Sequence, residues 1–166
     1  MKYRIAFGIL LILLFSSLLF AQVILKSISF GDRSKKEITL TFDDGPHPVM
    51  TPQILKILKA QHVPATFFMI GQQVKKFPTI ALMVRKSGNE IGVHSLSHVN
   101  LKLVSDGRLE EEIGGAQKII KSYTGIESLY FRPPYGRYDQ RILAMADKYG
   151  MKTILWEADA YDYFPK

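Results

Sequence analysis

Apolar and polar residues follow one another along this chain in short patterns that predict alternating strands and helices. Runs rich in β-branched and aromatic residues predict strands, and stretches with apolar residues three or four positions apart predict helices. Because the two kinds of stretch alternate, we expect an α/β domain built on parallel strands. The predicted strands cover residues 38–42, 65–70, 90–93, 129–131 and 152–156.

Residues that favour helix ends delimit the helices between these strands. Thr51-Pro52 is typical of an N-cap followed by a proline in the first turn, and Ser105 is a second candidate N-cap. Glycine follows the later helices, where the chain must leave helical geometry. One helix is predicted from residue 51 onward, and the others cover 78–88, 105–125 and 139–149.

The first 25 residues differ from the rest of the chain. Lys2 and Arg4 precede an uncharged, predominantly apolar run to residue 25, and ~20 such residues suffice to span a bilayer. We therefore expect 1–25 to be a signal peptide or an N-terminal membrane anchor, and the sequence leaves both open. Because basic residues stay in the cytoplasm, the domain should be extracytoplasmic, either secreted or membrane-anchored at the cell envelope. Residues 26–37 predict a linker, and the domain covers 38–166.

Charge and cysteine content limit which binding partners and which metal ligands the chain can have. The formal net charge is +7, and the chain contains no cysteine. A basic exported domain suits an anionic envelope polymer, and no cluster of Lys and Arg interleaved with aromatic residues indicates nucleic acid as a partner. Without cysteine there is neither a disulfide nor a thiolate ligand, so any metal site must use His, Asp or Glu.

Polar side chains gather where the predicted strands end. Asp43 and Asp44 follow the first strand, and later strands are followed by polar clusters at 94–98, 132–135 and 159–162. The carboxyl ends of parallel strands meet at one edge of an α/β domain, where such proteins carry their sites. We therefore expect these clusters to converge on one mouth.

Two of these clusters together predict a metal site. His94 and His98 are four residues apart, a spacing that places both on one face of a helical turn. Two neutral imidazoles and one carboxylate suit a divalent metal such as zinc, and Asp44 can complete that set. Asp43 then lies beside the cation as a base for the attacking water, and Arg132 would hold Asp43 ionised and oriented.

Each of these interpretations has a simpler alternative. Two histidines at this spacing are often ordinary surface residues, Asp-Asp-Gly is common at the junction of a strand and a turn, and Arg132 can form an ordinary ion pair near the rim. Two histidines and a carboxylate also suit a non-haem iron oxygenase. A second carboxylate, Asp43, beside the ligand Asp44 favours hydrolysis instead.

Three motifs resemble those of a known family. Thr-Phe-Asp-Asp-Gly-Pro at 41–46, His-Ser-x-x-His at 94–98 and Arg-Pro-Pro-Tyr at 132–135 are similar to the first three motifs of the polysaccharide deacetylases. This is the NodB-homology group, carbohydrate esterase family 4, and the resemblance covers most of 38–166. It implies a distorted (β/α) barrel, a divalent ion (zinc, with cobalt, nickel or manganese as alternatives), and hydrolysis of N-acetyl or O-acetyl groups on a glycan.

The resemblance also implies a role for each matching residue. The catalytic base is then Asp43, which Arg132 orients, and the backbone N–H of Tyr135 helps to stabilise the oxyanion. Contacts with substrate are expected from Pro134, Tyr135 and Tyr163. The implied metal ligands are Asp44, His94 and His98.

The match weakens towards the end of the chain. Asp-Ala-Tyr-Asp-Tyr at 159–163 stands where the family commonly has Asp-x-x-Asp-Trp, so Tyr163 replaces a tryptophan. The family's later Leu-x-His motif, whose histidine acts as general acid with Asp162 as its partner, is missing. We therefore expect a C-terminally truncated domain and an incomplete barrel without its last strands, preceded by an N-terminal hydrophobic helix.

The expected activity is that of a polysaccharide deacetylase, a hydrolase acting on carbon–nitrogen bonds other than peptide bonds. Its partner would be an N-acetylated glycan, and the basic charge and the export segment favour peptidoglycan over a chitin-like oligomer. Through residues 1–25, if they are retained, the chain would also contact the membrane. The alternative is a truncated, weakly active or inactive glycan-binding pseudoenzyme of the same fold.

Overall fold

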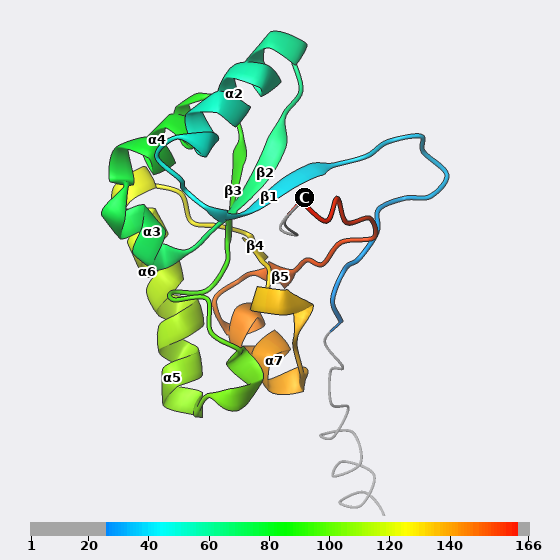
Figure 1. Cartoon of the computed structure of the whole chain (residues 1–166). Helices are drawn as coiled ribbons and strands as arrows, with labels where there is room; N and C mark the ends of the chain where they lie inside the picture. The colour runs from blue at the N-terminus through cyan, green and yellow to red at the C-terminus, as the bar shows by residue number, and fades with distance from the viewer. Residues whose placement is uncertain (1–25, 163–166) are drawn as a thin grey trace, which may run out of the picture.

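A five-stranded parallel sheet organises the computed structural model, which describes residues 26–162 (Figure 1). Within these residues the strands lie in chain order, and each pairs in parallel with the next. The predicted α/β fold with parallel strands is thereby confirmed. The strands are β1 (Leu40–Gly45), β2 (Ala65–Met69), β3 (Glu90–Val93), β4 (Tyr130–Phe131) and β5 (Lys152–Thr153).

Two of the sequence predictions fall outside the described residues. These are the apolar segment 1–25, expected to be a signal peptide or anchor, and Tyr163, expected to contact substrate. Within 26–162, no helix is both long enough and apolar enough to cross a membrane.

Helices connect the strands, and α2, α3, α4 and α6 lie along one side of the sheet in Figure 1. The predicted helix at 105–125 is continuous, but a π-helical turn at Glu111–Gly115 separates its two α-helical parts. The short helix α3 was not predicted. The α-helices are α2 (Met50–Gln61), α3 (Gly71–Lys76), α4 (Pro78–Lys86), α5 (Asp106–Glu110), α6 (Ala116–Thr124) and α7 (Gln140–Lys148).

The first strand and the first helix differ from prediction at their ends. Helix α2 begins at Met50, because the ring nitrogen Nδ1 of His47 accepts hydrogen bonds from the backbone N–H groups of Val49 and Met50. Thr51 therefore lies inside the helix rather than at its N-cap, and its hydroxyl accepts a hydrogen bond from the backbone N–H of His47. Strand β1 continues through both aspartates instead of ending at residue 42.

Successive residues of β2 face opposite sides of the sheet, as strand geometry requires. Phe67 and Met69 belong to the core cluster that includes buried residues of the helices, whereas the ring of Phe68 lies 4.0 Å from the guanidinium carbon of Arg132. Gly92 of β3 pairs with Phe68, and a Cβ at Gly92 would lie 2.3 Å from the Phe68 ring. The missing side chain at Gly92 therefore gives Phe68 the space from which it contacts Arg132.

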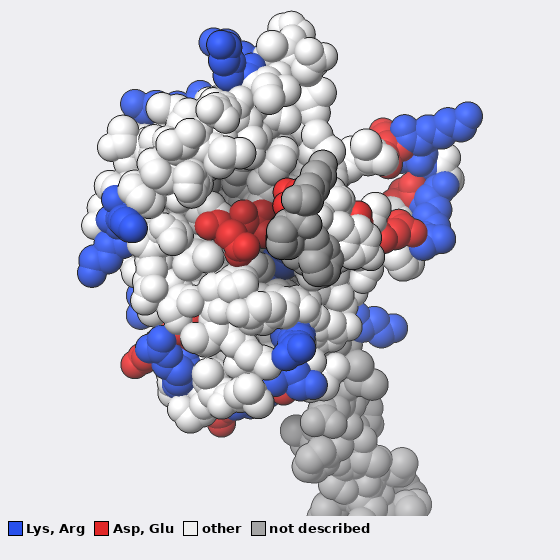
Figure 2. All heavy atoms as spheres, in the orientation of Figure 1, with Lys and Arg blue, Asp and Glu red and all other residues white. Residues whose placement is uncertain are grey.

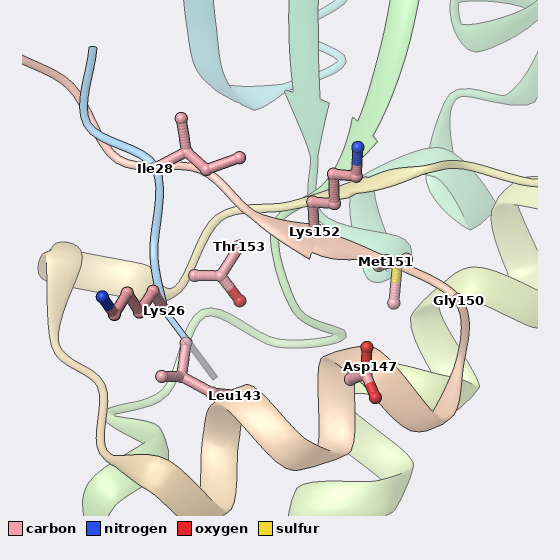
Figure 3. Close-up of a pocket in the computed structure, with 8 residues that line it drawn as sticks. All are labelled: Lys26, Ile28, Leu143, Asp147, Gly150, Met151, Lys152 and Thr153. Carbon is pink, nitrogen blue, oxygen red and sulfur yellow. The ribbon is translucent and has the colours of Figure 1, made fainter. Parts of the chain in front are cut away.

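The polar segment before β1, expected to be a linker, joins the sheet at one point. Ile28 pairs in parallel with Ile154, and its N–H donates to the carbonyl of Thr153 at 2.9 Å while its carbonyl accepts from Leu155 at 2.8 Å. A pocket of about 250 Å³ lies between this segment, β5 and α7 (Figure 3). Its lining residues are Lys26, Ile28, Leu143, Asp147, Gly150, Met151, Lys152 and Thr153, and none of them is a predicted site residue.

We expect Gly92→Ala to lower the free energy of unfolding by about 1–3 kcal/mol, because the new methyl group overlaps the Phe68 ring. The matched control is Gly115→Ala: a Cβ there meets nothing within 4 Å, so this change should be neutral or stabilising. Urea denaturation of the two variants measures the difference. A Gly92→Ala chain as stable as the wild type would contradict this account of the sheet.

Candidate active site

The carboxyl ends of β1, β3 and β4 bring the predicted site residues to one edge of the sheet. Acidic side chains gather in a hollow near the carboxyl end of β1, which carries Asp43 and Asp44 (Figure 2). The pairing of β1 with β2 is irregular between Phe42 and Gly45, and Asp44 has a left-handed backbone with φ of 66°. This irregularity allows two neighbouring carboxylates, which would point apart in a regular strand, to face the same histidine.

Asp44, His94 and His98 form a group that can hold a metal ion. One ligand atom from each lies within 4.8 Å of the others, and Oδ1 of Asp44 is 3.1 Å from Nε2 of His98 and 3.4 Å from Nε2 of His94. The carbonyl oxygen of Arg132 lies 2.7 Å from Nδ1 of His94 and can only accept, so Nδ1 carries the proton. In the neutral ring, Nε2 of His94 therefore has a lone pair that it can offer to a cation, an arrangement typical of metal-binding histidines.

The two histidines do not lie on a helical turn, so that part of the prediction was wrong. Residues 94–98 form an irregular loop after β3, and Ser95 and His98 have left-handed backbones with φ of 64° and 61°. The hydroxyl of Ser95 accepts a hydrogen bond from the backbone N–H of His98 at 2.9 Å. The rings converge, with centroids 5.0 Å apart, because the loop folds back on itself.

Arg132 is buried rather than placed at the rim, with 2% of its surface exposed. Its Nη1 donates to Oδ1 of Asp43 at 2.7 Å and to the hydroxyl of Thr41 at 2.8 Å. Its remaining nitrogens donate to the carbonyls of Ile154 and Leu155. Since a buried guanidinium makes these contacts in a fixed planar geometry, it determines the orientation of the Asp43 carboxylate.

Electrostatics favour the protonation states that a metal site needs. Without a cation, a hydrogen bond from a protonated His94 ring lowers the pKa of Asp44 below its usual value, burial opposes this shift, and the positive charges of both histidines lower the pKa further. Burial lowers the pKa of His98, His94 acts in the same direction, and the charge of Asp44 opposes it. Both shifts favour the forms that bind divalent cations, an ionised carboxylate and a neutral imidazole.

The other predicted site residues differ in how they lie relative to the candidate metal ligands. Tyr135 lies in a 3₁₀ turn (Pro134–Gly136), its ring centroid is 4.8 Å from that of His98, and its hydroxyl donates to the His98 carbonyl at 3.3 Å. Pro134 is buried, so its ring supports the turn more than it meets solvent. Asp162 is exposed and, within 26–162, makes no ion pair with the group of Asp44 and its histidines.

Three residues that hold Arg132 were missed by the sequence analysis. The hydroxyl of Thr41 accepts from its guanidinium, and the rings of Phe68 and Trp156 lie 4.0 Å and 5.6 Å from its guanidinium carbon. Thr41 belongs to the first motif, and this position could have indicated a role. Phe68 and Trp156 look like ordinary strand residues, and only the folded chain brings them to Arg132.

The polysaccharide deacetylase family matches residues 30–154, and the chain belongs to this family. Among curated relatives, it is 36% identical over 133 residues to a peptidoglycan-N-acetylglucosamine deacetylase of Bacillus cereus, covering 80% of this chain and 48% of the relative. It is 36% identical over 132 residues to a chitooligosaccharide deacetylase of Azorhizobium caulinodans, covering 79% and 63%. The chain thus spans about half to two thirds of the length of these relatives.

Solved structures confirm the fold. A carbohydrate esterase family 4 pseudoenzyme from Bacillus anthracis superimposes with a TM-score of 0.80 at 32% identity, covering 83% of this chain and 49% of that one. The peptidoglycan deacetylase PdaC from Bacillus subtilis gives a TM-score of 0.72 at 38% identity, covering 80% and 64%. The predicted membership of the NodB-type deacetylases is therefore confirmed, and the chain corresponds to part of their fold.

In the metal-free chain, NMR titration should place the pKa of His98 below its usual value of 6.5, because burial disfavours the charged imidazole. Asp44→Asn should lower this pKa further, since the negative charge of Asp44 raises it in the wild type. The exposed Asp147→Asn on α7 is the matched control and should leave it unchanged. A pKa of His98 that rises in Asp44→Asn would contradict the assigned electrostatics.

Proposed function

We propose that this chain carries out the metal-dependent hydrolysis of acetyl groups on a glycan, as a polysaccharide deacetylase. The bond cleaved would be the N-acetyl amide or an O-acetyl ester of a cell-wall or chitin-like polysaccharide, with peptidoglycan as the first choice. Family membership supports the reaction class. The relatives named for peptidoglycan and chitooligosaccharide deacetylation support the class of substrate.

The position of Asp43 is the observation that carries the proposal. Its Oδ1 accepts from Arg132 at 2.7 Å, and its Oδ2 lies 4.0 Å from Nε2 of His94. The oxygen that Arg132 does not hold therefore faces the candidate metal ligands. A water molecule placed there can give its proton to Oδ2 as it attacks the acetyl carbonyl, which is the role of a general base.

The donor set at this point fits a divalent cation held by Asp44, His94 and His98. Zinc is the first choice, with cobalt, nickel or manganese as alternatives. Such a cation, when bound, polarises the carbonyl and lowers the pKa of the attacking water. The same ligands would suit an iron oxygenase, but an oxygenase has no evident use for a second carboxylate held by Arg132.

The remaining roles concern the substrate and the leaving group. Tyr135 has a left-handed backbone in the turn beside the candidate ligand His98. The backbone N–H of Tyr135 is proposed to donate to the oxyanion. Tyr135 and Tyr163 are proposed to contact the sugar, and the buried Pro134 to act beside them by supporting the turn that carries Tyr135. Asp162 is proposed as the partner of the histidine that protonates the leaving amine in the family, a histidine that the 166 residues do not contain.

The proposed place of action is outside the cytoplasmic membrane, at the cell envelope. Residues 1–25 would act there as a signal peptide or as a membrane anchor, followed by a linker over 26–37 and the deacetylase domain over 38–166. The net charge of +7 suits an anionic wall polymer. A weakly active or inactive glycan-binding protein is the second candidate, because a carbohydrate esterase family 4 pseudoenzyme is among the solved structures that share this fold.

The double change His94→Ala, His98→Ala should abolish stoichiometric zinc in the dialysed chain, because one carboxylate cannot hold zinc alone. Elemental analysis measures zinc per chain. The matched control is His47→Ala, His62→Ala, since His47 caps α2 and His62 ends it. If the chain without His94 and His98 still retains one zinc, the assignment of these residues as ligands is contradicted.

The 166-residue chain should be slow on N-acetylglucosamine oligomers but active, with added metal, on an activated aryl acetate. An amine leaves poorly without a proton, and a positioned general acid contributes typically ~10²–10⁴-fold. An aryl oxide leaves without protonation, so Asp43 and the cation suffice for the ester. Release of the aryl oxide and of free amine measures the two reactions.

Further variants distinguish the role of Asp43 as general base from the effect of the missing general acid. Asp43→Ala should remove the metal-dependent ester hydrolysis, and the exposed Asp147→Asn should leave it intact. Adding a C-terminal segment with the family's Leu-x-His motif should restore amide hydrolysis. Brisk amide hydrolysis by the 166-residue chain alone would mean that another residue supplies the proton, whereas no ester hydrolysis at all would favour the glycan-binding alternative.

A further inference from the structure

Glu112 is a fully buried carboxylate, with 0% of its surface exposed, that the proposed reaction does not use. It lies in the π-helical turn Glu111–Gly115 between α5 and α6. Burying a carboxylate is costly unless its charge is paired and its oxygens accept hydrogen bonds. The neighbouring Glu111, by contrast, is exposed. The contacts of Glu112 therefore indicate why the chain places a charge there.

The contacts of Glu112 lead to the histidine loop. Its Oε2 accepts from the backbone N–H groups of Leu96 at 3.0 Å and Ser97 at 2.9 Å. Its Oε1 accepts from the hydroxyl of Ser97 at 2.5 Å and from Nη2 of Arg108 at 2.6 Å. Arg108 compensates the charge, and the other three bonds all go to residues between His94 and His98.

The backbone of this loop has few other acceptors for its N–H groups. The N–H of His94 donates to the carbonyl of Met69, and that of His98 donates to the hydroxyl of Ser95. Of the three N–H groups between them, those of Leu96 and Ser97 donate to Glu112. Because unpaired backbone groups in a partly buried loop are costly, Glu112 favours this conformation over the alternatives.

The conformation that Glu112 favours is also strained. Ser95 and His98, on either side of the two bonded N–H groups, have φ of 64° and 61°. Residues other than glycine adopt this region only where the surroundings impose it. A loop released from Glu112 would relax towards ordinary backbone angles, and Nε2 of His98 would move from its place 3.1 Å from Asp44.

We propose that Glu112 is a positioning residue for the metal ligands, whose carboxylate fixes the loop that brings His98 to His94 and Asp44. Its hydrogen bonds within residues 26–162 go to Leu96, Ser97 and Arg108, so it acts on the ligands through the loop that carries Leu96 and Ser97. This inference rests on the proposed function, because it assumes that Asp44 and the two histidines hold a cation.

Zinc affinity, measured by competition with a chromophoric chelator on the 166-residue chain, tests the inference. Glu112→Ala should weaken zinc binding by about 10- to 100-fold, the usual effect of removing a residue that orients metal ligands. The matched control is Glu111→Gln: Glu111 precedes Glu112 and pairs with the same Arg108 but does not touch the loop. Its zinc affinity should equal that of the wild type.

Two conservative variants separate positioning from charge. Glu112→Gln loses the charge but keeps an oxygen that can reach both backbone N–H groups, so it should stay closest to the wild-type affinity. Glu112→Asp keeps the charge but is one methylene shorter, so it should weaken zinc binding towards the level of Glu112→Ala. The reverse order, with Asp near wild type and Gln impaired, would overturn the inference.

A general loss of stability must also be distinguished from a loss of positioning. Ile120→Ala removes buried side chain in α6, about two turns beyond Glu112, and should leave zinc affinity and the absorption spectrum of bound Co²⁺ unchanged. Glu112→Asp should change that spectrum, because the geometry of the ligands changes. Equal loss of affinity in Ile120→Ala, or wild-type affinity in both Glu112→Asp and Glu112→Ala, overturns the inference alone. Absence of zinc binding by the wild type overturns the proposed function with it.

Discussion

The buried guanidinium of Arg132 connects the two ends of the sheet. It projects from the end of β4, donates to Thr41 and Asp43 of β1, and donates to the two carbonyls that follow β5. Strands β1 and β5 are first and last in the strand order. A buried cation is tolerated only with a counter-ion and filled donors. Asp43, the proposed base, is that counter-ion, so folding itself fixes the position from which it would act.

Backbone strain is concentrated where the functional side chains converge. Asp44, Ser95, His98 and Tyr135 have φ between 61° and 66°, although none of them is glycine. Each such residue costs of order 1–3 kcal/mol, and the surrounding contacts must offset that cost. These contacts include the Ser95 hydroxyl on the His98 N–H and the Tyr135 hydroxyl on the His98 carbonyl. The site is therefore an arrangement that local preferences oppose and that tertiary structure imposes.

The difference between local preferences and tertiary structure explains how much of the protein could be predicted from its sequence. The α/β fold with parallel strands and the meeting of Asp43, His94 and Arg132 follow from periodicity and from the common edge of parallel strands, whereas the order of the strands was not predicted. The loop at 94–98 was predicted as a helical turn, because spacing does not reveal left-handed residues. Glu112 follows another glutamate and lies 15 and 16 residues from the groups it binds. The local sequence does not distinguish Glu112 from Glu111. The two differ in burial, which only the folded chain shows.

Each candidate ligand is held by protein groups that come from a different part of the chain. The carbonyl of Arg132 fixes the ring of His94, the contacts of the 94–98 loop fix His98, and the irregular end of β1 fixes Asp44. The free energy needed to bring the three together is therefore supplied by the sheet and by the helix that carries Glu112. Tight metal binding by this group would then depend on residues that do not touch the cation. A change far from the site in sequence can reduce metal affinity while every ligand is still present.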